Sequence, residues 1–121
     1  MTEIQNNKQY DLEDRTLEFA RNVRNFIKTI PITIANIEDG KQVIRSSGSV
    51  GANYIEANES LSKKDFAMRI KISRKEAKES SYWLRLIDTR GNVQLEKEIQ
   101  ILTQEAIELM KIFGSILQKS Q

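Results

Sequence analysis

Histidine and cysteine are both absent from the 121 residues of this sequence. Without histidine, the chain lacks the commonest general base and the commonest metal ligand of proteins. Without cysteine, it cannot form a disulfide scaffold, a thiolate metal site or a cysteine nucleophile, and this composition suits a cytoplasmic protein. We therefore predict no catalytic residues, no metal site and no cofactor, and an enzyme is the third hypothesis after two binding functions.

Long apolar runs and a targeting signal are absent as well. No apolar stretch approaches the roughly 20 residues that a membrane-spanning helix needs. The first residues, MTEIQNNKQYD, have neither the basic start nor the apolar stretch of a secretory signal. The length of 121 residues predicts one domain, and the 30% of charged residues predicts that it is soluble. We therefore expect a cytoplasmic protein without a membrane partner.

Proline occurs only once, and no segment shows the alternation typical of a β-strand. Four segments instead repeat apolar residues at spacings of three and four, which is typical of amphipathic helices. The predicted helices span residues 12–30, 31–58, 63–89 and 93–118. Short polar turns join them, so the sequence predicts an all-α, up-down-up-down four-helix bundle over residues 11–121, preceded by a polar, frayed arm at residues 1–10.

Capping residues mark the expected helix ends. Asp11 is the predicted N-cap of the first helix, and Pro31 ends that helix or starts the next. Ser62 is the predicted N-cap of the third helix, with Leu61 packed against Phe66 as a hydrophobic staple. These signals place short turns between the helices, as an antiparallel bundle requires.

The fourth helix has the most regular apolar pattern in the chain and follows a turn at Gly91 and Asn92. Gly91 is the predicted C′ residue of the third helix, and Asn92 is the predicted cap of the fourth. The fourth helix carries more apolar residues than one seam needs, which predicts a second buried surface. The surplus residues are Ile101, Ile107, Met110, Ile112 and Leu117.

The stretch Val43–Ala57, VIRSSGSVGANYIEA, carries only two charged residues, Arg45 and Glu56. A helix so poor in charge cannot keep one face in water, so we expect cover on more than one side. Gly48 and Gly51 each cost about 1 kcal/mol in a helix interior, and close approach of a neighbouring backbone is the usual compensation. A loop is the alternative, because SSGSVG has a loop-like composition, but helical periodicity continues on both sides.

Polar residues of the second helix are predicted to form a network with the basic third helix. Ser49, Asn53 and Glu56 share one stripe with Ser46 and Ser60. We predict hydrogen bonds that fix helix register or a subunit contact, made by Arg45, Ser49, Asn53, Glu56 and Arg69. The alternative is a ligand-binding or catalytic pocket near Asn53 and Glu56.

The third helix begins with a basic block. Between Lys63 and Lys78 there are seven basic and two acidic residues, a net charge of +5. The block predicts a positive surface that engages phosphates with little sequence preference. Its expected nucleic-acid-binding residues are Lys64, Lys71, Arg74, Lys75 and Lys78. The alternative is a solvated face that keeps the protein soluble, and Tyr82 and Trp83 are expected in the core or an interface.

Two stretches resemble a known family. RSSGSVGANYIEA and, after a turn, KKDFAMRIKISRKEAKESSYWLRLI are similar to the bacterial 23S rRNA intervening-sequence proteins. Arg45, Ser49, Asn53 and Glu56 match the family pattern in the second helix, whereas Ala57 replaces its glycine. In the third helix the matches are Ala77, Ser80 and Leu84, and the departures are Glu79 and Trp83. The resemblance covers about residues 10–118.

The resemblance implies a homopentamer of four-helix bundles, shaped as a short barrel, in a family for which no enzymatic activity is established. Its relatives include the accessory protein of diversity-generating retroelements, a basic pentameric barrel considered to bind nucleic acid and a reverse transcriptase. The leading hypothesis is therefore a non-enzymatic homo-oligomer that binds RNA or DNA. The alternative is a protein-interaction or assembly scaffold that binds a protein partner and has no nucleic-acid role.

Overall fold

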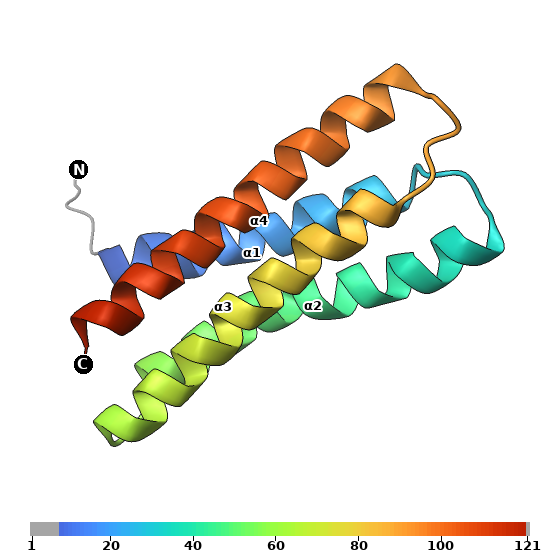
Figure 1. Ribbon diagram of the computed structural model, residues 1–121. Helices are drawn as coiled ribbons and strands as arrows, with labels where there is room; N and C mark the ends of the chain where they lie inside the picture. Colours follow the sequence, from blue (N-terminus) through green and yellow to red (C-terminus); the bar gives the residue numbers. More distant parts are fainter. Residues whose placement is uncertain (1–7, 121) are drawn as a thin grey trace.

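The fold consists of four α-helices: α1 (Lys8–Ile27), α2 (Ile34–Asn58), α3 (Lys63–Leu86) and α4 (Val93–Lys119). The structure is a computed structural model that describes residues 8–120, with side chains from Leu12 onward, and residues 1–7 of the predicted arm lie outside it. No strand occurs between residues 8 and 120. Consecutive helices run antiparallel and pack side by side (Figure 1). The predicted all-α fold with four helices is confirmed.

The starts of α1 and α2 differ from their predictions. Helix α1 begins three residues before Asp11, which therefore lies inside the helix and is not its N-cap. No proline or glycine interrupts residues 8–11, so nothing stops the helix there. The N-cap of α2 is Thr33, whose Oγ1 accepts a hydrogen bond from the Asn36 N–H at 3.0 Å. Pro31 lies in the connection before it and does not start the helix.

The turn between α2 and α3 confirms one prediction and contradicts another. Ser62 is the N-cap of α3, and its Oγ accepts a hydrogen bond from the Asp65 N–H at 3.1 Å. The side chain of Leu61 is fully exposed. The predicted staple against Phe66 is therefore wrong, because the turn directs Leu61 into solvent.

Helix α3 ends three residues earlier than predicted, because Ile87 has extended backbone angles of φ −60° and ψ 129°. In the turn that follows, Arg90 and Gly91 have φ values of 53° and 76°, and the Asn92 N–H donates to the Thr89 carbonyl oxygen at 3.1 Å. Gly91 is thus a central residue of this turn and not the C′ residue of α3. Asn92 caps α4 as predicted, since its side chain accepts a hydrogen bond from the first turn of that helix.

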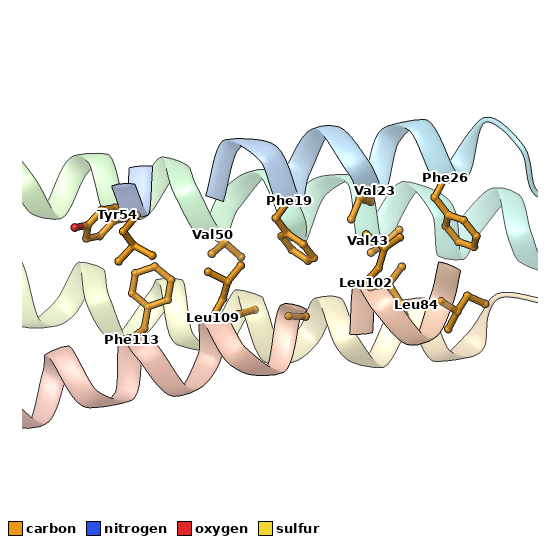
Figure 2. Packing of buried hydrophobic residues seen from close by; sticks show 14 of the residues in the cluster. Phe19, Val23, Phe26, Val43, Val50, Tyr54, Leu84, Leu102, Leu109 and Phe113 are labelled. Carbon is orange, nitrogen blue, oxygen red and sulfur yellow. The ribbon is translucent and has the colours of Figure 1, made fainter. Parts of the chain in front are cut away.

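The core runs along the bundle axis and receives side chains from every helix (Figure 2). In the described part of the chain, its largest fully buried members are Phe19, Val23, Phe26, Val43, Val50, Ile70, Leu84, Leu109 and Phe113. Tyr54 of α2 lies beside Phe113 of α4, with ring centroids 5.5 Å apart (Figure 2). These residues follow the spacings of three and four seen in the sequence, because that period keeps one face of each helix toward the axis.

The charge-poor stretch of α2 is helical throughout, so the loop alternative is wrong. It is covered by α1 and α3, as expected (Figure 1). Toward α3, the Ser73 Oγ donates to the Val50 carbonyl oxygen at 2.8 Å, and the hydroxyl oxygens of Ser46 and Ser80 are 2.8 Å apart. Toward α1, the two helices are close at Gly51, where an added Cβ would be 2.7 Å from the Thr16 Oγ1. Small side chains on both sides of α2 therefore allow these close contacts.

The apolar surplus of α4 is largely used within the chain. Leu117 is buried, and Ile107, Met110 and Ile112 are half-buried, whereas Ile101 is 68% exposed. The predicted second buried surface is thus mostly part of the chain's own packing. The exposed large apolar side chains on α1, α2 and their connection are Leu17, Ile32, Ile34, Ile37 and Ile55.

Asn36 ties two connections together at one end of the bundle. Its Nδ2 donates to the carbonyl oxygens of Pro31 and Asp88, both at 2.9 Å, and its Oδ1 accepts from the Asp88 N–H at 2.9 Å. The residue is buried at the start of α2. It therefore holds the α1–α2 connection against the α3–α4 connection, which lie at the same end of the molecule (Figure 1).

Candidate nucleic-acid interface

Four of the five predicted phosphate-binding residues line one groove between α3 and α4. Helical spacing places these residues on one side of α3. The groove has a volume of about 490 Å³ and is lined by Lys71, Arg74, Lys75 and Lys78 of α3 and by Met110, Lys111 and Gly114 of α4. All five of its cationic side chains are exposed. Tertiary structure thus gathers more positive charge here than α3 alone supplies.

Two basic residues show where the prediction was incomplete. Lys64 is exposed on α3, two turns before Lys71, and is not among the residues that line the groove. Lys111 lines the groove but was not predicted, because α4 has no run of basic residues that would mark this lysine out from the others in the helix. The stem of Arg74 packs beside Gly114, where an added Cβ would be 3.6 Å from the Arg74 Cδ. Only the packing of α4 against α3 brings Lys111 to this site.

The acidic residues in the second half of α3 are turned away from the groove and toward α2. The Arg45 Nη2 lies 3.3 Å from the Glu76 Oε1 and 3.3 Å from the Glu79 Oε1. The Glu76 side chain is only 8% exposed, whereas that of Arg45 is 53% exposed. A buried carboxylate needs such a partner, since an unpaired one would be costly. Arg45 therefore pairs with both carboxylates on the α2 side of α3.

Two acidic residues of α4 are turned toward α1 in the same way. The Arg15 Nε donates to the Glu105 Oε2 at 2.7 Å, and its Nη2 donates to the Glu108 Oε1 at 3.0 Å. The hydrogen bond with Glu105 raises the pKa of Arg15 above its usual range. Hydrogen bonds from Gln104 and Arg15 lower the pKa of Glu108, and the Lys111 charge has a smaller effect in the same direction. These carboxylates are thus engaged on the α1 side of α4.

The result is a segregation of charge around α3 and α4. Within the described part of the chain, none of the five groove cations forms an ion pair with a carboxylate. Positive side chains on a concave surface between two helices concentrate the field at that surface. The groove can therefore attract phosphate groups.

The predicted polar network is divided between two places. The Arg69 Nη1 donates to the Asn53 Oδ1 at 2.9 Å, and the Asn53 Nδ2 donates to the Ser49 Oγ at 2.9 Å. Arg45 lies apart from these residues, with Glu76 and Glu79. Glu56 is exposed, and its side chain makes no hydrogen bond within residues 12–120. The network therefore links α2 to α3 through Asn53 and Arg69, and Glu56 lies outside it.

The two neighbouring aromatic residues of α3 occupy different environments. Trp83 is half-buried and packs against the core. Tyr82 is 55% exposed, so it is not a core residue of the chain. The two rings meet edge to face, with centroids 5.1 Å apart and an interplanar angle of 77°. Trp83 thus restrains the ring of Tyr82 at the surface.

The described residues provide neither a cluster of metal ligands nor a helix suited to a membrane. In that part of the chain, no three acidic side chains come close enough to hold a metal ion. None of the four helices, over residues 8–119, combines the length and the apolar character that crossing a bilayer requires. The groove between α3 and α4 is therefore the candidate site that the described geometry supports best.

Sequence comparison places the fold among known proteins. Residues 8–115 match the model of the family described as 23S rRNA-intervening sequence protein. The chain belongs to this family. A protein of unknown function from the S23 ribosomal protein family of Bacteroides thetaiotaomicron has a similar solved structure, with 31% identity, a TM-score of 0.75, and coverage of 93% of this chain and 99% of that chain. No curated protein matches the sequence.

In this 23S rRNA-intervening sequence protein, the predicted family resemblance is confirmed. The matching residues Asn53 of α2 and Ser80 of α3 lie where these helices pack together. The groove cations lie on the α4 side of α3. Asn53 and Ser80 are therefore on the α2 side of α3, apart from the basic groove.

Proposed function

We propose that this 23S rRNA-intervening sequence protein is a non-enzymatic, cytoplasmic protein that binds nucleic acid through the groove between α3 and α4. The observation that carries this proposal is the set of five groove cations without a carboxylate partner in the described part of the chain. Each cation can neutralise one backbone phosphate, and counterion release then favours binding with little dependence on sequence. Lys64 extends the positive surface along α3.

Reversal of charge in the groove tests this function. A double variant, Lys71→Glu with Lys75→Glu, should weaken binding at least tenfold and reduce the slope of log K against log salt by about 2, since each phosphate contact contributes about 0.9. The measurement is fluorescence anisotropy of labelled oligonucleotides between 50 and 200 mM salt, a range over which such contacts change affinity by orders of magnitude.

The matched control is Lys97→Glu with Lys119→Glu. This pair makes the same change in net charge at exposed positions outside the groove, so it should retain most of the affinity. An equal loss in both double variants would show that net charge, and not the groove, determines binding. Binding that is insensitive to salt would contradict the proposal altogether.

Assembly into a homo-oligomer, with a pentamer implied by the family resemblance, is the second part of this proposal. It is supported by the exposed apolar side chains of Leu17, Ile37 and Ile55 on α1 and α2. Two hollows of about 330 and 270 Å³ lie between these helices and their connection, and their linings are mostly apolar with charged side chains among them. Exposed apolar surface of this kind is typical of protein contacts. Light scattering counts the subunits, and Leu17→Lys with Ile55→Lys should reduce their number.

A scaffold for a protein partner is the second candidate function, because the same α1–α2 face could receive another protein. The two candidates predict different results from purified material. Nucleic-acid binding predicts co-purifying nucleic acid, seen as a raised ratio of absorbance at 260 nm to that at 280 nm, which falls after a high-salt wash. A stoichiometric protein partner without nucleic acid would favour the scaffold.

A further inference from the structure

Tyr82 lies in line with the cations of the groove. It follows Lys78 by four residues and precedes Arg85 by three, and both of these basic residues are exposed. Residues three and four apart share one face of an α-helix, and α3 remains helical through Leu86. From Lys71 to Tyr82 the helix rises about 16 Å, at about 1.5 Å per residue. An aromatic ring thus stands between cations at one end of the basic face.

The ring is both accessible and held in place. Tyr82 is 55% exposed, while its edge-to-face contact with Trp83, at 5.1 Å between centroids, limits its motion. Trp83 is in turn fixed by packing against the core. A ring that is already ordered loses less conformational entropy when a ligand stacks on it.

An ordered aromatic ring beside cations recognises unpaired bases. In a duplex, the bases stack on one another and their faces are covered, so the protein meets mainly phosphates and groove edges. In a single strand, base faces are available, and stacking on an aromatic side chain raises affinity about 5- to 150-fold per base, with little sequence preference. The cations can bind the phosphates of both forms, whereas the ring can stack only on the bases of a single strand.

We infer that the basic face of α3, formed by the groove cations, Tyr82 and Arg85, is a site for single-stranded nucleic acid, with one base stacked on Tyr82. This inference rests on the proposed function and adds the class of ligand. The phosphates of the strand lie along Lys71, Arg74, Lys75, Lys78 and Lys111. The base nearest the Arg85 end contacts the ring.

The test compares a labelled 20-mer of oligo-dT, the matching oligo-U and a 20-base-pair dA·dT duplex, titrated against the full chain and its variants. The wild-type chain should bind the single strands more tightly than the duplex. Tyr82→Leu should weaken single-strand binding by about 5- to 150-fold and leave duplex binding unchanged. Tyr82→Phe keeps the ring and should bind as the wild type does. Comparison of the two single strands reports separately on a preference for DNA or RNA.

The only tryptophan of the chain supplies an independent signal. Because Trp83 contacts Tyr82, a base stacked on Tyr82 should change the Trp83 fluorescence, and the duplex should not. Circular dichroism shows whether Tyr82→Leu is folded, and the Tyr82→Phe and fluorescence results decide the matter if it is not.

The failures of the two proposals are distinguishable. Equal affinity for single strand and duplex, or an equal loss of both in Tyr82→Leu, overturns this inference but leaves the proposed function standing. Absence of binding to every oligonucleotide overturns both.

Discussion

Gly48 and Gly51 lie close together on α2, yet their surroundings differ. A Cβ at Gly51 would be 2.7 Å from the Thr16 Oγ1 and 3.0 Å from the Thr16 Cβ. Thr16 is buried, and its hydroxyl donates to the Glu13 carbonyl oxygen, so it cannot move aside easily. A Cβ at Gly48 would be 3.3 Å from the Arg24 Nη2, the end of a flexible, exposed side chain. Only Gly51 is therefore required by close helix packing.

The two glycines make a matched pair of substitutions. Gly51→Ala should destabilise the fold by about 1–3 kcal/mol, because the added methyl group overpacks the α1–α2 contact. Gly48→Ala should be neutral or stabilise it by up to about 1 kcal/mol, because alanine favours the helix. Urea unfolding followed by circular dichroism measures both. Equal effects would mean that the α1–α2 contact is looser than these distances indicate.

The connections between helices depend on contacts that span the chain. Asn36 joins the two connections at one end of the bundle through three hydrogen bonds to Pro31 and Asp88. In the sequence alone, an asparagine at the start of a helix is typical of a turn or a cap. Its partner Asp88 is 52 residues away. No local pattern identifies such a pair, and only the antiparallel arrangement of α2 and α3 brings it together.

Loss of this amide should loosen that end of the bundle. Asn36→Ala leaves the Asp88 N–H and two carbonyl oxygens without their partner, so we expect a loss of about 1–3 kcal/mol in unfolding free energy. Hydrogen exchange should increase most at the C-terminal ends of α1 and α3, which lead into the two connections. Asn25→Ala, at an exposed position of α1, is the control and should change stability by less than about 0.5 kcal/mol. If hydrogen exchange at these helix ends is as slow in Asn36→Ala as in the wild-type chain, the amide does not hold this end of the bundle.

Charged contacts connect α1 and α4 beside the apolar core. Arg15 bridges Glu105 and Glu108 across these helices. The pKa of Glu108 is lowered from its usual value of 4.5, first by a hydrogen bond from Gln104 within α4 and then by the one from Arg15 across to α1. A carboxyl group with a lowered folded-state pKa adds stability that is fully present above its unfolded-state value and is lost as the pH falls through the lowered pKa. Acidification below about pH 4.5 should therefore weaken the α1–α4 contact.

The pH dependence of thermal unfolding tests this contact. Between pH 6 and pH 3 the melting temperature should fall less in Arg15→Met than in the wild-type chain, because the variant has already lost the pairing. Lys41→Met removes an exposed pair with Glu38 within α2 and should keep the wild-type pH dependence, since such pairs contribute little. Parallel curves for Arg15→Met and the wild type would refute the α1–α4 contribution.

The amino-acid pattern by itself determined that the chain forms four helices, where their apolar faces lie, and that α3 is basic. These features are local: spacings of three and four, caps such as Ser62 and Asn92, and composition each act within a few residues of the chain. The errors at Asp11, Pro31 and Leu61 were at helix ends, where competing caps and turns differ little in free energy.

Tertiary structure alone decided how the charges are distributed. Arg45 draws Glu76 and Glu79 toward α2, and Arg15 draws Glu105 and Glu108 toward α1. Lys111 joins the groove only because α4 packs along α3. The energy of a charge interaction depends on the distance between the two groups. For groups on different helices, the sequence does not give that distance. A basic block that the sequence could equally assign to solvation thus becomes a groove of positive charge, with Tyr82 beside it.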